Sequence, residues 1–245
     1  MEVLAVGGIP EVRPGDDLGR LIVEHAQPRA GDIVVVAQKV VSKAEGRLRK
    51  LSEIEPTPEA VELARGLDDH DPRLVQAILD ETVRIVRKQR ILIVETRHGF
   101  VCANAGIDHS NVPGEDSVSL LPDDSDRSAG GLRERIRELA GVEVAVIVSD
   151  TFGRAWRMGI ENVALGVAGM PVFADYRGQL DDHGKELLVT VVAVADELAA
   201  AAELVMGKTA RVPVVLIRGY TPYTPDGPPG TGRDLVRPAG LDLFR

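Results

Sequence analysis

The chain has 245 residues and a formal net charge of −9, with 44% apolar and 27% charged residues. This composition is typical of a globular protein, and the acidic balance argues against nucleic-acid binding, which usually needs a basic face. The single cysteine, Cys102, excludes an internal disulfide, so a cytoplasmic location is the simplest expectation. We expect no membrane partner, because the first residues lack a signal-peptide pattern and the apolar runs are too short to span a bilayer.

Hydrophobic periodicity and turn residues predict the following elements in chain order. A strand (1–6), a helix capped by Asp16 or Asp17 and ending near residue 25, and a buried strand (33–37) come first. Helices at 56–64 and 72–80 follow, and then strands at 84–86, 90–96 and 100–103. A polar loop (104–116) leads to a helix (125–139), a buried strand (142–148), an apolar run (187–194), a helix (196–206) and a closing strand (212–217).

Several of these strands are neighbours along the chain, without a helix between them. Simple alternation of strand and helix would predict a doubly wound parallel sheet, whereas adjacent strands favour a mixed sheet. We therefore expect an α+β or mixed α/β fold, in which helices flank a mixed β-sheet. Residues 1–245 are expected to form one domain, with two subdomains as an option.

The strongest candidate site follows the buried strand 142–148. Asp150 and Thr151 stand side by side at its expected end, where ligands bind in open α/β sheets. Their oxygen atoms suit Mg²⁺ or Mn²⁺ with bound phosphates. Arg154 and Arg157 follow and suit a phosphate or carboxylate. A helix cap with two solvated arginines explains the same residues equally well.

A second candidate is the loop 105–111, which carries Asp108, His109 and Asn111. Asp108 could be a second metal carboxylate, and Asn111 could contact a base or a phosphate. Gly, Asp, Ser and Asn are also the usual turn formers, and from the loop alone a turn is the better interpretation. His109 is read as an exposed loop residue, because no zinc-site spacing surrounds it.

Basic and glycine-rich segments supply the third candidate. Lys39 and Lys43 would lie one turn apart on a helix and suit a polyphosphate, although a charge run is more often a solvated surface. The turn at residues 7–10 could bind an anion through its backbone N–H groups. The chain contains neither GxGxxG nor GxxxxGK[ST], so any nucleotide must be bound without those motifs.

Taken together, these segments resemble the F420-0:γ-glutamyl ligase family. GIPE (8–11), KVVSKAEGR (39–47), AGIDHSN (105–111) and SDTFGRAWR (149–157) occur in the family's order and at similar spacing. DYRG (175–178) and ADELA (195–199) add to the likeness, which covers essentially the whole chain. No single motif is decisive, but the set would rarely arise by chance.

The resemblance implies roles for individual residues. Two divalent metals, Mg²⁺ or Mn²⁺, would be held by Asp108, Asp150 and Thr151, and K⁺ is a further candidate ion. Catalysis would depend on Asp108, Asp150, Lys43 and Arg154. The GTP site would include the residues of the first motif and four others: Gly8, Ile9, Pro10, Glu11, Gln38, Lys43, Asn111 and Lys208.

Two positions depart from the family pattern. Gln38 stands where Ser or Thr is frequent, and Lys208 stands where Gln lies near the second metal. The resemblance also implies an intertwined homodimer of mixed α/β subunits. Some bacterial members carry a flavin-binding, nitroreductase-like domain, which we expect to be absent from a chain ending at Arg245.

The expected activity is GTP-dependent addition of L-glutamate to coenzyme F420-0 through a γ-linked amide, by way of an acyl phosphate. F420-0 offers a carboxylate and a phosphodiester, so both it and GTP are anions that metals and lysines must screen. Three alternatives remain open: a ligase or phosphotransferase for another carboxylate, a non-catalytic GTP-binding sensor, and a flavin or deazaflavin oxidoreductase.

Overall fold

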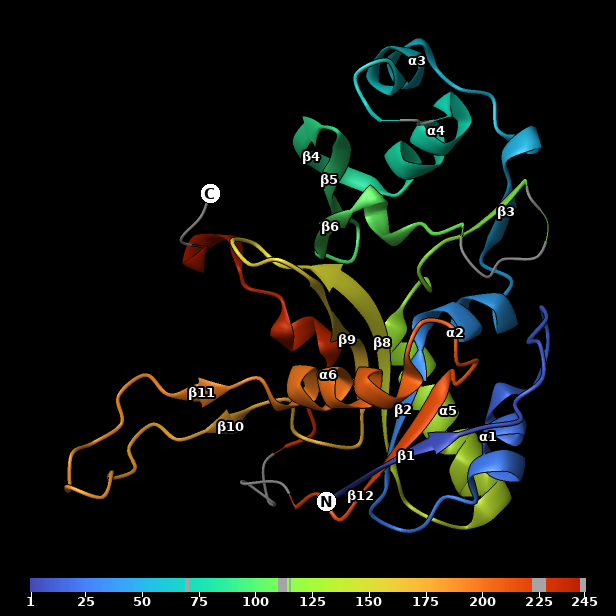
Figure 1. Cartoon of the computed structure of the whole chain (residues 1–245). Coiled ribbons are helices and arrows are strands. Elements are labelled where there is room, and N and C mark those ends of the chain that lie inside the picture. Colours follow the sequence, from blue (N-terminus) through green and yellow to red (C-terminus); the bar gives the residue numbers. More distant parts are fainter. Residues whose placement is uncertain (69–70, 110–113, 115, 222–227, 243–245) are drawn as a thin grey trace.

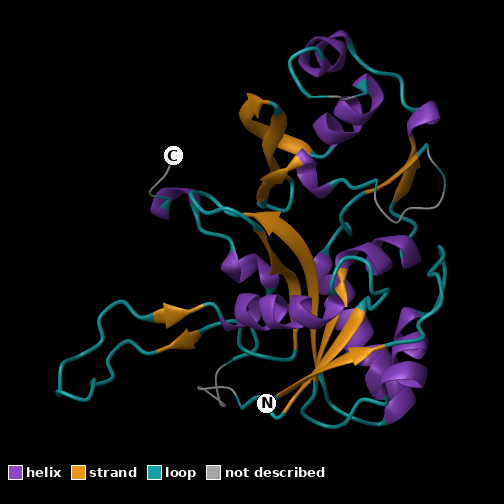
Figure 2. Cartoon of the chain, in the orientation of Figure 1, coloured by secondary structure: helices purple, strands orange, loops and turns teal. Residues whose placement is uncertain are grey.

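The computed structural model describes residues 1–68, 71–109, 114, 116–221 and 228–242. The chain forms two stacked parts, which we call the main part and the upper part (Figure 1). The main part is built on a five-stranded mixed sheet, and the upper part holds a three-stranded sheet with two helices. Figure 2 shows helices and strands in both parts, and the predicted α+β fold is confirmed.

The main sheet has the strand order β1-β12-β2-β8-β9. Only the central pair, β2 with β8, is parallel, and the other three pairs are antiparallel. The sheet is therefore mixed, as predicted. Its strands are β1 (Glu2–Val6), β12 (Val214–Arg218), β2 (Ile33–Ala37), β8 (Ala145–Gly153) and β9 (Ile160–Ala168).

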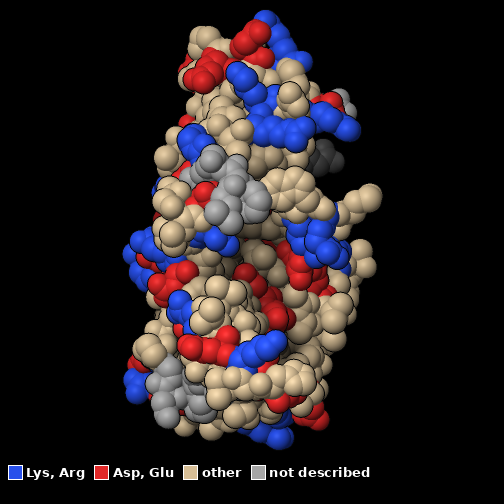
Figure 3. Space-filling view, turned by 90° about the vertical axis from the view of Figure 1, so that its left-hand side faces the viewer, with Lys and Arg blue, Asp and Glu red and all other residues tan. Residues whose placement is uncertain are grey.

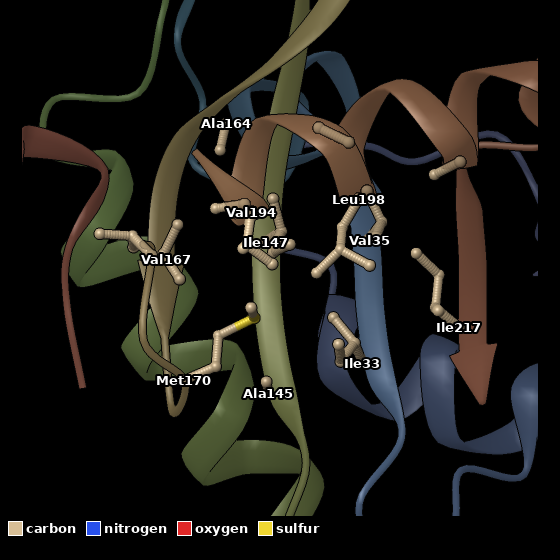
Figure 4. Packing of buried hydrophobic residues seen from close by; sticks show 14 of the residues in the cluster. Ile33, Val35, Ala145, Ile147, Ala164, Val167, Met170, Val194, Leu198 and Ile217 are labelled. Carbon is tan, nitrogen blue, oxygen red and sulfur yellow. The ribbon is translucent and has the colours of Figure 1, made fainter. Parts of the chain in front are cut away.

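Helices cover both faces of this sheet, because its central strands are apolar on both sides. In β2, Ile33 and Val35 pack with helix α6 (Val194–Met206), as Figure 4 shows. Val34 and Val36 point to the opposite face and its separate core. That face is covered by α1 (Leu18–Ala26), α2 (Gln38–Ala44) and α5 (Ser125–Ala140).

The upper part has a core of its own, built from buried residues such as Leu74, Ile78, Leu92 and Val94. Two short antiparallel strands, β3 and β7, join it to the main part. Its elements are β3 (Leu48–Lys50), η1 (Leu51–Glu53), α3 (Pro58–Ala64), α4 (Pro72–Asp80), β4 (Thr82–Gln89), β5 (Ile91–Thr96), β6 (Val101–Ala103), η2 (Asn104–Gly106) and β7 (Ser117–Ser119).

An arm projects from the main part (Figure 1). Within the described part of the chain, its two strands, β10 (Ala174–Asp175) and β11 (Val191–Val192), pair only with each other. The apolar run 187–194 lies here, and it holds only β11 and the start of α6, with Leu188 and Val189 exposed to solvent. The 3-10 turns η3 (Gly232–Leu235) and η4 (Ala239–Leu241) close the described chain.

The strand 33–37 is found at the predicted residues, whereas the helix predicted at 56–64 begins at Pro58. The helix 72–80 is found at those residues, and Asp17 caps α1 by accepting a hydrogen bond from the backbone N–H of Arg20. The predicted strand 142–148 is wrong at both ends, because β8 begins at Ala145 and continues to Gly153. Pairing with β9 keeps the polar second half of β8 in strand conformation, and the sequence did not predict β9. Among the described residues, no helix is long and apolar enough to cross a membrane.

Candidate active site

Helix α2 brings two lysines to one region, because it starts directly after the buried strand β2. Lys39 and Lys43 are one turn apart on this helix, which meets the condition under which the sequence placed their ammonium groups together. The Lys39 ammonium donates to Asp108 Oδ2 at 2.7 Å. Lys43 is only 4% exposed, and its ammonium donates to Glu11 Oε1 at 2.5 Å. Both charges are thus placed by carboxylates from distant parts of the chain.

Asp108 is positioned by a strained turn. Asn104, Ala105 and Gly106 all have positive φ, at 50°, 55° and 69°, a conformation that costs free energy for residues other than glycine. Beyond the turn, the backbone of Asp108 exchanges two hydrogen bonds with Ser119 of β7, with N–O distances of 3.2 and 2.9 Å. The turn and this bridge together direct the carboxylate toward α2. Such strain often marks a functional site.

Asp150 and Thr151 lie in the second half of β8, beyond an irregularity in its pairing with β9 between Val148 and Ser149. β-bulges of this kind are frequent beside active sites, where they redirect side chains. Pairing continues after the irregularity, with Asp150 opposite Val163. The two candidate ligands are therefore held by a paired hairpin and not by a free loop.

The pKa of the Asp150 carboxyl is raised to about 6. Burial is the main cause, and the negative charge of Asp108 adds to it. The backbone N–H of Thr151 and the ammonium groups of Lys39 and Lys208 act in the opposite direction. Asp108 and Asp150 thus interact electrostatically across the two parts of the molecule, and a cation between them would relieve their repulsion.

A second polar cluster surrounds Thr151. Its hydroxyl accepts a hydrogen bond from the Lys208 ammonium at 2.6 Å and donates to Asn162 Oδ1 at 2.7 Å. Lys208 also forms an ion pair with Glu203 of α6. The other oxygen of Glu203 accepts from the backbone N–H of Asn162 at 2.8 Å. Lys208 therefore brings a positive charge directly to the predicted metal ligand Thr151.

Comparison with known proteins identifies the family of this chain. Residues 8–219 match the model of the F420-0:Gamma-glutamyl ligase family. The chain belongs to that family. It is 50% identical to the coenzyme F420:L-glutamate ligase of Methanopyrus kandleri over 239 residues, which are 96% of this chain and 94% of the relative. It is 47% identical to that of Methanothermobacter thermautotrophicus over 253 residues, covering 100% and 99% of the two chains.

A further relative, the coenzyme F420:L-glutamate ligase of Methanocaldococcus jannaschii, is 45% identical over 217 residues, or 88% of this chain and 85% of the relative. Relatives at this identity and coverage are ligase enzymes, so this member of the F420-0:γ-glutamyl ligase family is also a ligase enzyme. The resemblance inferred from the sequence motifs is confirmed.

The ligase has a donor set that suits one divalent ion at Asp108 and Asp150. No cluster of three or more His, Cys, Asp or Glu side chains suited to a metal occurs among the described residues. Mg²⁺ does not require one, because it usually binds one or two carboxylates and completes its shell with water and substrate phosphates. In the face shown in Figure 3, Asp and Glu side chains gather in a hollow at mid-height, with Lys and Arg beside it.

The residues predicted to bind GTP occupy different environments in this ligase. The segment 8–11 follows β1, and Glu11 is joined to the buried Lys43. The amide of Gln38 is buried and donates to the carbonyl of Leu120 at 3.1 Å and to the hydroxyl of Ser42. Gln38 therefore fastens α2 to the segment that returns from the upper part.

Arg154 and Asn111 are the remaining predicted site residues. Arg154 lies near the tip of the β8–β9 hairpin, where its guanidinium pairs with Glu161 at 2.9 Å and donates to the carbonyl of Met158 at 3.1 Å. The carboxylate of Glu161 therefore offsets the positive charge of Arg154. Asn111 lies outside the described residues.

Three residues of this ligase gained importance only from the structure. The sequence singled out Lys39 for its charge but gave no sign of its contact with Asp108. Glu203 and Asn162 were not singled out, although both belong to the cluster at Thr151. The helical spacing of Glu203 from the ADELA motif would have been the one available signal. Cys102 is buried, as expected, and its pKa is raised to about 12 by burial and by Asp150, so it remains a thiol.

Proposed function

We propose that this ligase joins the amine of L-glutamate to the carboxylate of coenzyme F420-0 and uses GTP to activate that carboxylate. Its relatives at 45–50% identity bear the name coenzyme F420:L-glutamate ligase, and they match it over most of their length. The observation that carries the proposal is the Asp108–Asp150 pair, which lies beside the ammonium of Lys39. The family to which the chain belongs supplies the identity of the substrates. Two carboxylates and an adjacent ammonium are suited to a metal–polyphosphate substrate.

In the first step, a carboxylate oxygen of F420-0 attacks the γ-phosphorus of GTP. The new P–O bond forms as the bond to the β-phosphate bridging oxygen breaks, which gives an acyl phosphate and GDP. Both reactants are anions, so catalysis depends on fixed positive charge. Lys43 provides buried charge on α2, and Lys39 adds a second charge one turn away. A divalent ion held by Asp108 and Asp150 would supply charge neutralisation at the phosphates.

In the second step, the glutamate amine attacks the acyl carbon, inorganic phosphate leaves, and the amine loses a proton to form the amide. Water must be kept from the acyl phosphate, because hydrolysis would waste it. The site lies between the two parts of the molecule, with Asp108 on the upper side and Asp150 on the main sheet. Closure of these two parts on the substrates would exclude water. A second round on the product would extend a γ-linked glutamate chain.

We also propose that the ligase acts as a homodimer in the cytoplasm. The arm formed by β10 and β11 stands away from the main part and exposes Leu180, Leu188 and Val189. Apolar side chains on a projecting arm have little cover within their own chain and favour contact with a second copy. Two arms exchanged in this way would produce the intertwined subunits that the family resemblance implies.

The direct test is to incubate the purified chain with F420-0, L-glutamate, GTP and Mg²⁺ or Mn²⁺ and to analyse the products by mass spectrometry. Glutamate-sized mass increases with equal release of GDP and phosphate are expected. Replacement of F420-0 by other carboxylates tests the alternative acceptor class. Nucleotide binding without product from F420-0, in a folded and metal-loaded protein, would contradict the proposal.

A further inference from the structure

Lys208 occupies the position at which a cation would contact Thr151. Its ammonium is 2.6 Å from the Thr151 hydroxyl oxygen and forms an ion pair with Glu203. The Thr151 hydroxyl in turn donates its proton to Asn162 Oδ1 at 2.7 Å. The Thr151 hydroxyl thus accepts a hydrogen bond from Lys208 and donates one to Asn162. These two bonds occupy its proton and one of its two lone pairs.

This arrangement disfavours a second divalent ion at Thr151. The carboxylate in this cluster belongs to Glu203, and one of its oxygens is paired with Lys208 while the other accepts from the backbone of Asn162. A metal at this position would approach a protonated ammonium, which cannot be a ligand and repels it. Hard divalent ions bind carboxylate, carbonyl and water oxygens, and here the carboxylate of Glu203 is already paired with the Lys208 ammonium.

The pair Asp108 and Asp150 differs in this respect. Lys39 approaches Asp108 through one oxygen, Oδ2, and a carboxylate has two oxygens that can serve an ammonium and a metal together. Asp150 adds a second carboxylate at this position. The ammonium of Lys208 also acts on Asp150, but it is already paired with Glu203, whereas no ion pair of Asp150 occurs among the described residues.

We propose that the Lys208 ammonium takes the place of a second divalent ion at Thr151, so that each active site of this ligase binds one divalent metal, at Asp108 and Asp150. Lys208 then presents a permanent positive charge to substrate phosphate, and Glu203 and Thr151 position it. The inference deepens the proposed function and rests on it for the identity of the substrate, whereas the metal count is argued from the contacts of Lys208, Glu203 and Thr151.

The test counts metal ions on the intact protein. Metal-free wild type, Lys208→Gln and Lys208→Met are loaded with Mn²⁺ and a non-hydrolysable GTP analogue and then desalted. Manganese and nucleotide are measured per subunit by elemental analysis and absorbance. We expect one Mn²⁺ per subunit in wild type and two in Lys208→Gln, whose amide oxygen offers a neutral ligand. Lys208→Met, which is neutral but a poor ligand for hard ions, should retain one.

Lys88→Gln is the matched control, because Lys88 is an exposed lysine on β4 of the upper part and should leave the count at one. Lys208 is itself 53% exposed, so its substitution should not unfold the chain, and a thermal melt of each variant checks this. Two Mn²⁺ ions per subunit in wild type would overturn the inference, as would a single ion in folded Lys208→Gln. A wild-type protein that binds one ion but adds no glutamate to F420-0 would refute the proposed function and leave this inference standing.

Discussion

The ammonium of Lys39 lies 2.7 Å from Oδ2 of Asp108 and so joins helix α2 of the main part to the turn that follows β6 of the upper part. The two residues are 69 positions apart in the chain. The side chains of Lys39 and Asp108 are 21% and 44% exposed, so solvent weakens the ion pair without abolishing it. It places positive charge beside Asp108 and Asp150 and offsets part of their mutual repulsion.

Replacement of Lys39 by Ala should therefore make the protein more dependent on metal. Without the ammonium, the repulsion between Asp108 and Asp150 is less compensated, and the metal-free protein should lose about 1 kcal/mol of unfolding free energy. Mg²⁺ binding should restore that loss, so the metal-induced rise in Tm should be larger for Lys39→Ala than for wild type, with Lys39→Arg between them. Equal metal-induced shifts in all three proteins would show that Lys39 does not compensate the carboxylates.

Asp150 should make metal binding depend on pH. Burial, with the charge of Asp108, raises the pKa of this carboxyl from 3.8 to about 6. The folded state thus retains the proton to a higher pH than the unfolded state. Stability of the metal-free protein from this group is therefore present below about pH 4 and is lost as the pH rises through about 6. Metal binding needs the ionised form, so the affinity for Mn²⁺ should rise through the same range and level off above it.

The measurement is a series of Mn²⁺ titrations between about pH 5 and 8, in parallel with thermal melts of the metal-free protein. Asp150→Asn should stay folded, lose most of its metal affinity and its turnover, and show a weaker dependence of Tm on pH. An affinity for Mn²⁺ that is independent of pH below 6 in wild type would exclude Asp150 as a ligand with a raised pKa. Full turnover by Asp150→Asn would remove this residue from the mechanism.

The sequence predicted those features whose cause is local. Asp17 accepts a hydrogen bond from the backbone N–H of Arg20 at the start of α1, and such capping is readable from a few neighbouring residues. β9 was missed because a sequence such as IENVALGVA, with Gly166 and Asn162, does not favour a strand by itself. It becomes a strand by pairing with β8 and packing against α5 and α6.

The candidate site shows the same contrast between features with a local cause and features that depend on tertiary packing. Asp108, Asp150, Thr151 and Lys43 were found from residue type and from the family motifs. Lys208 was singled out as well, but its hydrogen bond to Thr151 was not predicted. The two residues are 57 positions apart, and that contact depends on how the C-terminal end of α6 meets the β8–β9 hairpin. Sequence patterns specify which side chains have suitable chemistry, whereas the charge balance around them is set by tertiary packing.

Glu81 should stabilise the connection between the two parts of the ligase. It ends α4, is only 11% exposed, and pairs with Arg47 at 3.1 Å and with Arg97 at 3.2 Å. Arg47 follows α2, so this network connects the upper part to the helix that carries the two lysines. Glu81→Gln keeps the shape but removes the charge, and it should lower the unfolding free energy by about 1–3 kcal/mol.

Urea unfolding measures this loss, and Glu62→Gln is the control. Glu62 also pairs with an arginine, Arg65, but both side chains are more than 70% exposed, so the control should change stability by less than about 0.5 kcal/mol. Equal effects of the two substitutions would show that burial of the Glu81 network adds nothing to stability.

The arm provides a test of the proposed homodimer. Leu188 and Val189 are 70% and 87% exposed, and they project on a segment whose strands pair only with each other. Charged substitutions at both positions should not harm the core, but they would place carboxylates in any interface that the arm forms, where unpaired charges are costly. We therefore expect the Leu188→Asp, Val189→Asp double variant to shift the mass measured by light scattering from dimer toward monomer.

Leu204→Asp separates this effect from a general loss of surface apolarity. Leu204 is 86% exposed on α6, and it lies on the helix away from the arm, so its substitution should leave the mass unchanged. A double variant that remains dimeric under conditions where wild type is dimeric would place the interface elsewhere, and a monomeric wild type would refute the dimer itself. If the double variant is monomeric yet keeps full ligase turnover, each subunit must contain a complete active site, and the arm serves assembly alone.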